Sequence, residues 1–345
     1  MAYSRGYHSY RGRTPKWRIV VMVLLVIVIL AAIAVMLMSR NVVYDETGTP
    51  HLELPWQEET SSAEEVPEES LDLTIQEPEK AQTVCGFSTP VPLTRESWSL
   101  SLRQAEEGFA CNAVAVTLKD DKGNVYFDSA AALPGTVQFV EEETDVALAA
   151  VVAYSRQNQW QSIARISCFH DPIAANRDVE GMGLKNTGGY IFYDGNNSQW
   201  LDPAKPAARE YLCELAKEVA ALGFDEILLA DVSYPTVGKL DKIFYGEGET
   251  NANLTAFLEE MRTALAPYSV ALSIEVPKAV ITQGIDDDAG LLLAAIAPKV
   301  DRIYAASTAA EAPALAQTVS VASKSTGFVP ELTETDPGID SFLIS

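Results

Sequence analysis

The chain of 345 residues contains only four cysteines and three histidines. No two cysteines form a CxxC pair, and only one histidine, His170, follows residue 82. Zinc and similar metals need several such ligands at close spacing, so we predict no metal site and no cofactor. Most of the cysteines lie in apolar strand or helix patterns, which favours buried free thiols over disulfides.

Positive charge is also scarce. The chain has 25 Lys and Arg residues against 48 Asp and Glu residues, which gives a formal net charge of −23. Such a surface repels polyanions, so a nucleic-acid partner is excluded. A neutral or cationic partner fits this charge better.

Residues 19–38 contain no charged side chain. About twenty consecutive apolar residues match the thickness of a hydrocarbon core, which predicts a transmembrane helix with the lipid bilayer as its partner. The basic tail 1–18 carries five Lys or Arg residues and no acid. By the positive-inside rule we expect this tail in the cytoplasm and the rest of a single-pass cell-membrane protein outside it.

Residues 39–82 are rich in Glu, Pro, Ser and Thr. A segment of this composition cannot bury a core, and its like charges repel one another. We predict a disordered acidic stalk; an acidic segment that binds a partner is the alternative.

Residues 83–345 alternate between apolar strand patterns and helical patterns. The clearest helix is 205–222, followed by Gly223 as a C-terminal cap, and a second is 252–266. Alternating strands and helices indicate a parallel sheet covered by helices. Eight strands in this length favour a (β/α)8 TIM-type barrel, α/β in class. The predicted strands are 83–88, 110–118, 162–169, 226–232, 270–276, 301–306, 326–332 and 341–344.

Side-chain alternation supports a closed barrel. In the second strand, Val114, Val116 and Leu118 share one face and Ala113 and Ala115 the other. Branched residues should pack against the helices, with the small ones inside. The polar ends of the strands should then meet at the carboxyl-terminal rim, where barrel enzymes have their active sites.

Several segments resemble a known family. They are NAVAVTLKDDKGNVYFDS (112–129), IARISCFHDPIAANR (163–177), QWLDP (199–203) and the passage from 210 to Pro235, followed by SIEV (273–276). These are similar to the bacterial putative glycosyl hydrolase barrel domains, which resemble amylase-type glycosidases and often follow a membrane anchor. The resemblance implies a glycoside hydrolase-like barrel that acts on or binds polysaccharide or cell-envelope glycan.

One departure from the family affects catalysis directly. Family members typically read FDEIQFDYVRFP where this chain reads FDEILLADVSYP (224–235). The family's acid at the end of the fourth strand, the nucleophile by similarity to amylases, falls on Ala230. Asp231 is adjacent, but neighbouring residues of a strand point to opposite faces. Asp231 can reach the site only if the strand end bulges or has become a loop.

Other family positions are retained. Glu275 lies at the end of the fifth strand, where the resemblance implies the general acid. Hydrolysis of a glycoside needs two carboxylates, so the partner of Glu275 would be Asp231, Asp171 or Asp120. The substrate-binding residues implied by the resemblance or expected at the rim are Lys119, Arg165, Asp171, Trp200, Asp202 and Tyr304.

Each of these side chains also has a structural interpretation. Glu275 could pair with Arg165 or Lys119 in a buried ion network, and Asp231 could cap a strand end. Trp200 and Tyr304 could form a platform for sugar stacking or plug the barrel mouth.

Three functions follow. The first is an active, membrane-anchored, extracytoplasmic glycoside hydrolase with Glu275 as acid and Asp231 as a displaced nucleophile; the loss of the family acid at Ala230 leaves a catalytically impaired form as an open alternative. The second is a non-catalytic module that binds glycan or envelope components. The third is a receptor ectodomain that works through its acidic stalk.

Overall fold

The computed structural model divides the chain into two units, residues 1–74 and 75–345. It describes residues 42–44, 50–52, 83–108, 110–138, 141–246, 248–336 and 338–344.

In the first unit, strands β1 (Val42–Tyr44) and β2 (Pro50–Leu52) pair antiparallel, within the segment that we predicted as a stalk. The predicted cytoplasmic tail and transmembrane helix, residues 1–38, lie outside the described residues. Among the residues that are described, no helix has both the length and the apolar character to cross a bilayer.

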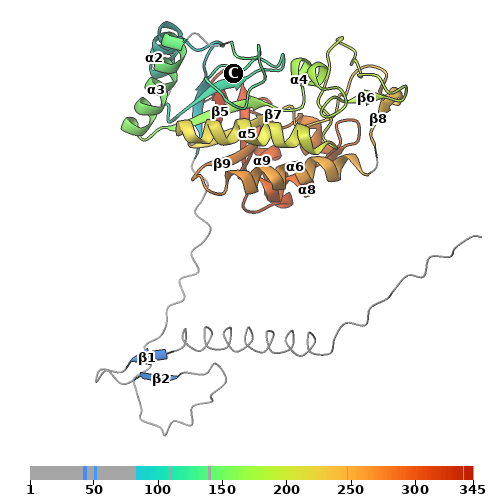
Figure 1. The fold of residues 1–345 in the computed structure, drawn as a ribbon. Helices are drawn as coiled ribbons and strands as arrows, with labels where there is room; N and C mark the ends of the chain where they lie inside the picture. The colour runs from blue at the N-terminus through green and yellow to red at the C-terminus, as the bar shows by residue number, and fades with distance from the viewer. Residues whose placement is uncertain are drawn as a thin grey trace, which may run out of the picture. The chain divides into compact units, whose positions relative to one another are not determined.

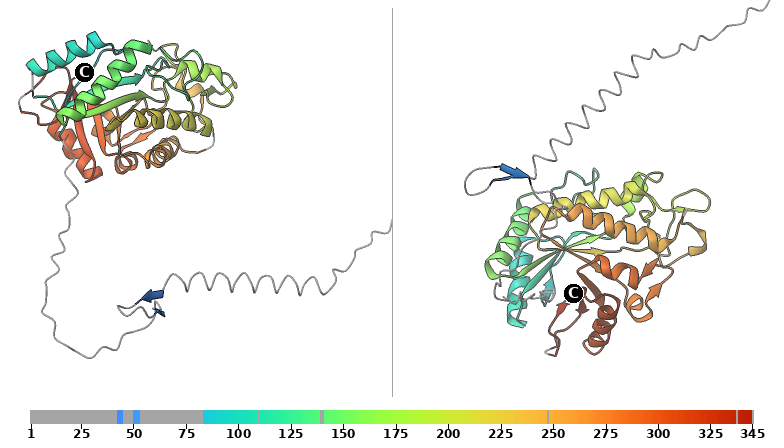
Figure 2. Two further views of the ribbon diagram at one scale, coloured as in Figure 1. Left: turned by 60° about the vertical axis from the view of Figure 1, so that its left-hand side comes forward. Right: turned by 90° about the horizontal axis from the view of Figure 1, so that it is seen from below.

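The second unit contains a closed barrel of eight parallel strands, in the order β12-β13-β14-β3-β4-β5-β7-β9 (Figures 1 and 2). This confirms the predicted TIM-type barrel, and each of the eight predicted strands is present. The strands are β3 (Cys85–Ser88), β4 (Ala113–Lys119), β5 (Gln161–Ser167), β7 (Glu226–Ala230), β9 (Ala271–Glu275), β12 (Arg302–Ala306), β13 (Gly327–Leu332) and β14 (Phe342–Ile344).

Helices connect most of these strands. The clearest predicted helix is α5, which begins at Pro206, where a missing N–H costs nothing, and ends before Gly223, whose φ of 94° is left-handed. The helices are α2 (Arg95–Gly108), α3 (Glu141–Asn158), α4 (Pro172–Arg177), α5 (Pro206–Leu222), α6 (Thr250–Leu265), α7 (Lys278–Gln283), α8 (Leu293–Ile296) and α9 (Ala312–Ala322). Between β13 and β14 the described residues form no helix.

Short elements decorate the loops. Strand β6 (Lys185–Asn186) pairs with β8 (Ile243–Phe244), and β10 (Ile285–Asp286) pairs with β11 (Leu291–Leu292). Figure 1 places β6 and β8 together, beyond the end of β7 and on the same side as α4. The connections that follow β5, β7 and β9 are therefore enlarged at the carboxyl-terminal rim.

The core has two layers, as the alternation predicts. Val114, Val116 and Leu118 of β4 are buried in the large cluster between strands and helices. Ala113 and Ala115 belong to a smaller cluster inside the barrel. The other members of this interior cluster are Val84, Ile163, Leu228, Tyr304, Val329 and Leu343.

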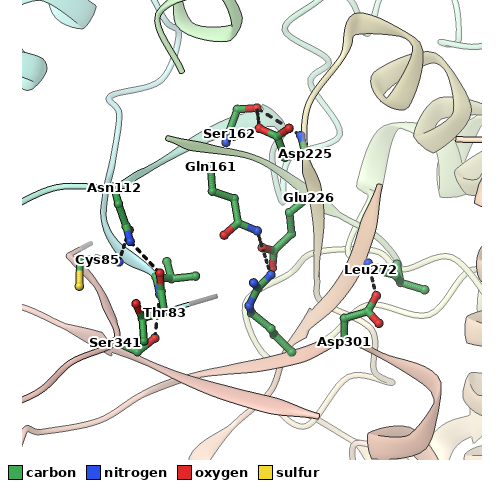
Figure 3. A network of polar contacts seen from close by, with 12 residues as sticks. Thr83, Cys85, Asn112, Gln161, Ser162, Asp225, Glu226, Leu272, Asp301 and Ser341 are labelled. Atoms are coloured by element: carbon green, nitrogen blue, oxygen red, sulfur yellow. Dashed lines mark hydrogen bonds and ion pairs between the residues drawn. The ribbon is translucent and has the colours of Figure 1, made fainter. Parts of the chain in front are cut away.

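Polar contacts close the amino-terminal end of the barrel (Figure 3). There, a side chain just before one strand accepts an N–H at the start of the neighbouring strand. These pairs are Asn112 Oδ1 with Cys85 N (2.7 Å), Asp225 Oδ2 with Ser162 N (2.9 Å), Asp301 Oδ2 with Leu272 N (2.8 Å) and Ser341 Oγ with Val84 N (3.1 Å).

A buried charge lies within the same end. Glu226 is fully buried and accepts hydrogen bonds from Arg302 at 2.7 Å and from Gln161 at 2.6 Å. Burial raises the pKa of Glu226, and the Arg302 guanidinium partly offsets this. These contacts stabilise the fold, so the functional site is to be sought at the opposite, carboxyl-terminal rim.

Candidate functional site

The backbone changes conformation at Asp231. Strand β7 ends at Ala230, and Asp231 has a φ of +52°, in the left-handed region that few side chains adopt. The Asp231 carboxylate accepts a hydrogen bond from the Ser167 hydroxyl at 2.6 Å. Ser167 is the register partner of Ala230 on the adjacent strand β5. The chain has therefore left the strand at this residue, and the carboxylate turns back toward the barrel mouth.

Glu275 and Arg165 form the second element of the site. Arg165 donates from Nε and from Nη2 to the same Glu275 oxygen, each at 2.8 Å. Burial alone would lower the pKa of Arg165, but the carboxylates of Glu275 and Asp231 raise it. Arg165 and Ser167 occupy successive inward positions of β5, so one strand contacts both candidate carboxylates.

Two cavities adjoin Asp231. One of about 210 Å³ is lined by Asp231, Glu275, Lys278 and Ala306, among others. The second, of about 380 Å³, is lined by Asp231, by Arg165 and by residues of the loop after β4. Asp231 lines both. A larger hollow of about 590 Å³ lies between α5 and α6, away from the inward-facing strand ends.

Glu331 is a further acid at the rim that the sequence did not indicate. It shares the parity of Val329, which lies inside the barrel, and follows it at the carboxyl end of β13. Burial, and then the charge of Glu275, raise the pKa of Glu331 to about 7, although Arg165 opposes the shift. Alternation in the predicted strand 326–332 places Glu331 inside, but this strand lies beyond the segments that carry the family resemblance.

Lys119 and Asp171 do not line the cleft. Their side chains are 1% and 0% exposed and form an ion pair at 3.0 Å. Lys119 also donates to the Ser167 carbonyl at 2.8 Å, and Asp171 caps α4 by accepting the Ala174 N–H at 2.8 Å. The two side chains are therefore not available for the predicted contact with substrate. They form a buried ion pair that holds the backbone of Ser167 through Lys119. A register shift between Thr117 and Lys119 accompanies this placement.

The two aromatic candidates are also buried. Tyr304 is 0% exposed inside the barrel, so it is a plug rather than a sugar platform. Trp200 is 8% exposed and stacks on His170 with ring centroids 4.3 Å apart. Its indole N–H donates to Asp194 at 3.0 Å. Neither ring presents a face for stacking.

Asp202 and Asp120 organise turns. Asp202 is 5% exposed and accepts the Ala204 N–H at 2.9 Å just before α5. Burial raises its pKa. Asp120 accepts the N–H groups of Lys122 and Asn124, as its predicted turn requires, and borders the 380 Å³ cavity. Burial would raise the pKa of Asp120, but hydrogen bonds from the Asn124 and Tyr126 side chains, together with these N–H groups, lower it overall.

Metal-ligand clusters are absent from the part of the rim that the structure describes. Within the described ranges, no three His, Cys, Asp or Glu side chains are grouped so that they could hold one. Cys168 and Cys213 are buried free thiols, and burial raises the pKa of each. The chemistry available at the rim is thus that of carboxylates beside a guanidinium.

Solved structures share this architecture. The PgaB (BpsB) glycoside hydrolase domain from Bordetella bronchiseptica is 13% identical, and the match covers 76% of this chain and 94% of that one with a TM-score of 0.52. At this identity the likeness shows the fold alone. No curated protein matches the sequence.

Two further structures are similar over parts of their length. A hypothetical protein from Ruminiclostridium thermocellum is 27% identical over 52% of this chain and 90% of its own, with a TM-score of 0.44. The GH20 β-N-acetylhexosaminidase from Streptomyces coelicolor is 13% identical over 74% of this chain, with a TM-score of 0.46. This chain spans about half of that enzyme, 49%.

The sequence itself carries the family assignment. Residues 99–307 match the family described as "Putative glycosyl hydrolase domain", which includes β4, β5, β7, β9 and almost all the candidate residues. Glu331 lies beyond the matched region. Since the match covers more than half of the chain, the protein belongs to this glycosyl hydrolase domain family.

Proposed function

We propose that the protein hydrolyses glycosidic bonds of a polysaccharide in the cavity between Asp231 and Glu275, with Asp231 as the carboxylate anion. One observation carries the proposal: the left-handed conformation of Asp231 brings an acid to the mouth of the barrel although Ala230 occupies the family's position. Both side chains line the same 210 Å³ cavity. Family membership supports the reaction class.

Asp231 is the carboxylate best placed to act as an anion. Glycoside hydrolysis needs a negative carboxylate that attacks the anomeric carbon or activates a water molecule, and a second group that protonates the leaving oxygen. The Ser167 hydroxyl donates a hydrogen bond to Asp231 and fixes the direction of its carboxylate. Cavities on both sides of Asp231 leave room for sugar rings on either side of the bond.

We further propose a membrane-anchored, extracytoplasmic enzyme that acts on envelope or extracellular polysaccharide. The uncharged run 19–38 and the basic tail before it support the anchor and the orientation. The acidic composition favours a neutral or cationic glycan over a polyanion.

A non-catalytic glycan-binding module is the second candidate. Ala230 in place of the family acid favours it, and so does the direct pairing of Glu275 with Arg165, which engages one of the two carboxylates.

Hydrolysis by the full-length protein distinguishes the two candidates. The measurement is the release of reducing ends from a panel of neutral and amino-sugar polysaccharides, with Asp231→Asn and Glu275→Gln as test variants. Asp241→Asn is the matched control, because Asp241 is 70% exposed and pairs with the neighbouring Lys242 on the surface. Turnover that both test variants lose supports the hydrolase, whereas binding without turnover by the wild type supports the module.

A further inference from the structure

The proposed reaction requires a proton donor, and Glu275 is poorly suited to be one. The leaving oxygen of a glycoside must be protonated as its bond to the anomeric carbon breaks. Glu275 accepts two N–H groups of Arg165 on one oxygen, as the anionic partner of an ion pair. The guanidinium thus holds one Glu275 oxygen in a fixed direction and occupies the position from which that oxygen would approach a leaving group. The donor implied by family resemblance is thus engaged otherwise.

Glu331 lies on the strand next to the same cavity, at the carboxyl-terminal rim. Its register partner on β12 is Ala306, and Ala306 lines the 210 Å³ cavity together with Asp231 and Glu275. Its parity with Val329 directs the side chain inward at the carboxyl end of β13. Among the described residues, the Glu331 carboxyl forms no ion pair or hydrogen bond that would hold it as an anion. The geometry thus offers a second inward-facing acid at the rim, beside the cavity and without a direct ion pair among the described residues.

The surroundings of Glu331 favour its protonated form. Burial disfavours the carboxylate, and the nearby negative charge of Glu275 adds to this effect. With a pKa of about 7, a large part of Glu331 is protonated at neutral pH. In sites that need both an acid and an anion, two neighbouring carboxyl groups usually have environments that give them different pKa values.

Resting on the proposed function, we propose that Glu331 is the catalytic residue that donates the proton to the leaving oxygen. As the bond from the anomeric carbon to that oxygen breaks, the oxygen keeps the electron pair and takes the proton of Glu331, so the leaving group departs as an alcohol. Asp231 supplies the anion on the other face. Water provides the hydroxyl of the new hemiacetal, and its second proton restores Glu331 directly or through solvent.

Leaving groups of different basicity test this assignment in the full-length protein. The substrates are a polysaccharide cleaved by the wild type and 2,4-dinitrophenyl glycosides of the same sugar, whose leaving group departs without protonation. We expect Glu331→Gln to lower turnover of the polysaccharide by about 10²–10⁴-fold, the usual contribution of a general acid. Turnover of the dinitrophenyl glycoside should fall by less than tenfold. The matched control is Glu334→Gln, because Glu334 is an exposed acid in the loop that follows β13.

The pH profile gives a second check that needs no variant. In the wild type, kcat/KM for the polysaccharide should decline as the pH rises above about 7, because Glu331 then loses its proton. The decline should be absent in Glu331→Gln. Equal losses on both substrates, or an unchanged alkaline decline in the variant, would overturn the role of Glu331. If the wild type hydrolyses neither substrate, the proposed function fails, and the assignment fails with it.

Discussion

The Ser167 hydroxyl and the Asp231 carboxylate are joined by a hydrogen bond of 2.6 Å, although Ser167 is the register partner of Ala230. The Asp231 carboxylate thus lies close to the position that an acidic side chain at residue 230 would occupy. Strand alternation alone would direct Asp231 to the helices, beside Ile227 and Leu229. The left-handed φ at Asp231 reverses that direction. A shift of one residue in sequence has therefore not removed the carboxylate from the rim.

This relationship predicts that Asp231 stores backbone strain for function. A left-handed residue with a side chain costs about 1 kcal/mol relative to glycine. Asp231→Gly and Asp231→Ala both lose the carboxylate and its hydrogen bond, and we expect both to reduce hydrolysis at least about 10²-fold. Urea denaturation should show the Gly variant to be the more stable by about 1 kcal/mol. Equal stabilities would mean that the positive φ is not maintained.

The buried pair beneath the rim predicts a large loss of stability. Lys119→Met leaves Asp171 buried without its cation, and breaking such a pair from one side costs about 3–5 kcal/mol. Lys242→Met is the control, since Lys242 and Asp241 are 59% and 70% exposed and an exposed pair contributes about 0–1 kcal/mol. Urea denaturation of both variants measures the difference. A loss at Lys119 as small as that of the control would contradict the supporting role of the pair.

The fold was predictable because local patterns and burial agree along most of the barrel. Val114 and Ala113 show the principle. Branched and small residues alternate along the strand, so the branched face packs against the helices and the small face lies inside the barrel. The two weakest patterns, 326–332 and 341–344, also form strands, because closing the barrel requires partners for β12 and β3.

The site was less predictable, for reasons visible in single residues. Periodicity gives the direction of a side chain only while the strand continues, and β7 ends one residue before Asp231. Lys119 and Asp171 are charged, yet their burial depends on each other and on a register shift that no local pattern encodes. Glu331 acquires its properties from Glu275, more than fifty positions away in the sequence.

Arg165 should set the pH range of the reaction. Its positive charge lowers the pKa of Glu331, and its removal also leaves the negative charge of Glu275 unopposed. Both effects raise the pKa of Glu331, so in Arg165→Met the alkaline decline of kcat/KM should move to higher pH even as the maximal rate falls. The pH dependence of kcat/KM for wild type and variant measures this shift. A decline that stays in place, or moves to lower pH, would indicate that another group titrates.

Glu331 should also make stability depend on pH without any substrate. Its pKa rises from an ordinary 4.5 to about 7 on folding, so the folded state holds the proton more tightly than the unfolded chain. Stability from this group is complete below about pH 4.5 and is lost as the pH rises toward 7. Glutamine mimics the protonated form at every pH. Glu331→Gln should therefore match the wild type near pH 4.5 and exceed it at pH 8.

Solvent screening limits the size of this stability difference between the wild type and Glu331→Gln. The full shift corresponds to about 3 kcal/mol, but Glu331 is only partly buried, so about 1–2 kcal/mol is expected. Thermal denaturation of wild type, Glu331→Gln and the exposed control Glu334→Gln at several pH values provides the measurement. The control should stay close to the wild type throughout. A Glu331→Gln difference that does not change with pH would show that folding does not raise the pKa of Glu331, so the carboxyl would be ionised at neutral pH and would have no proton to give to a leaving group.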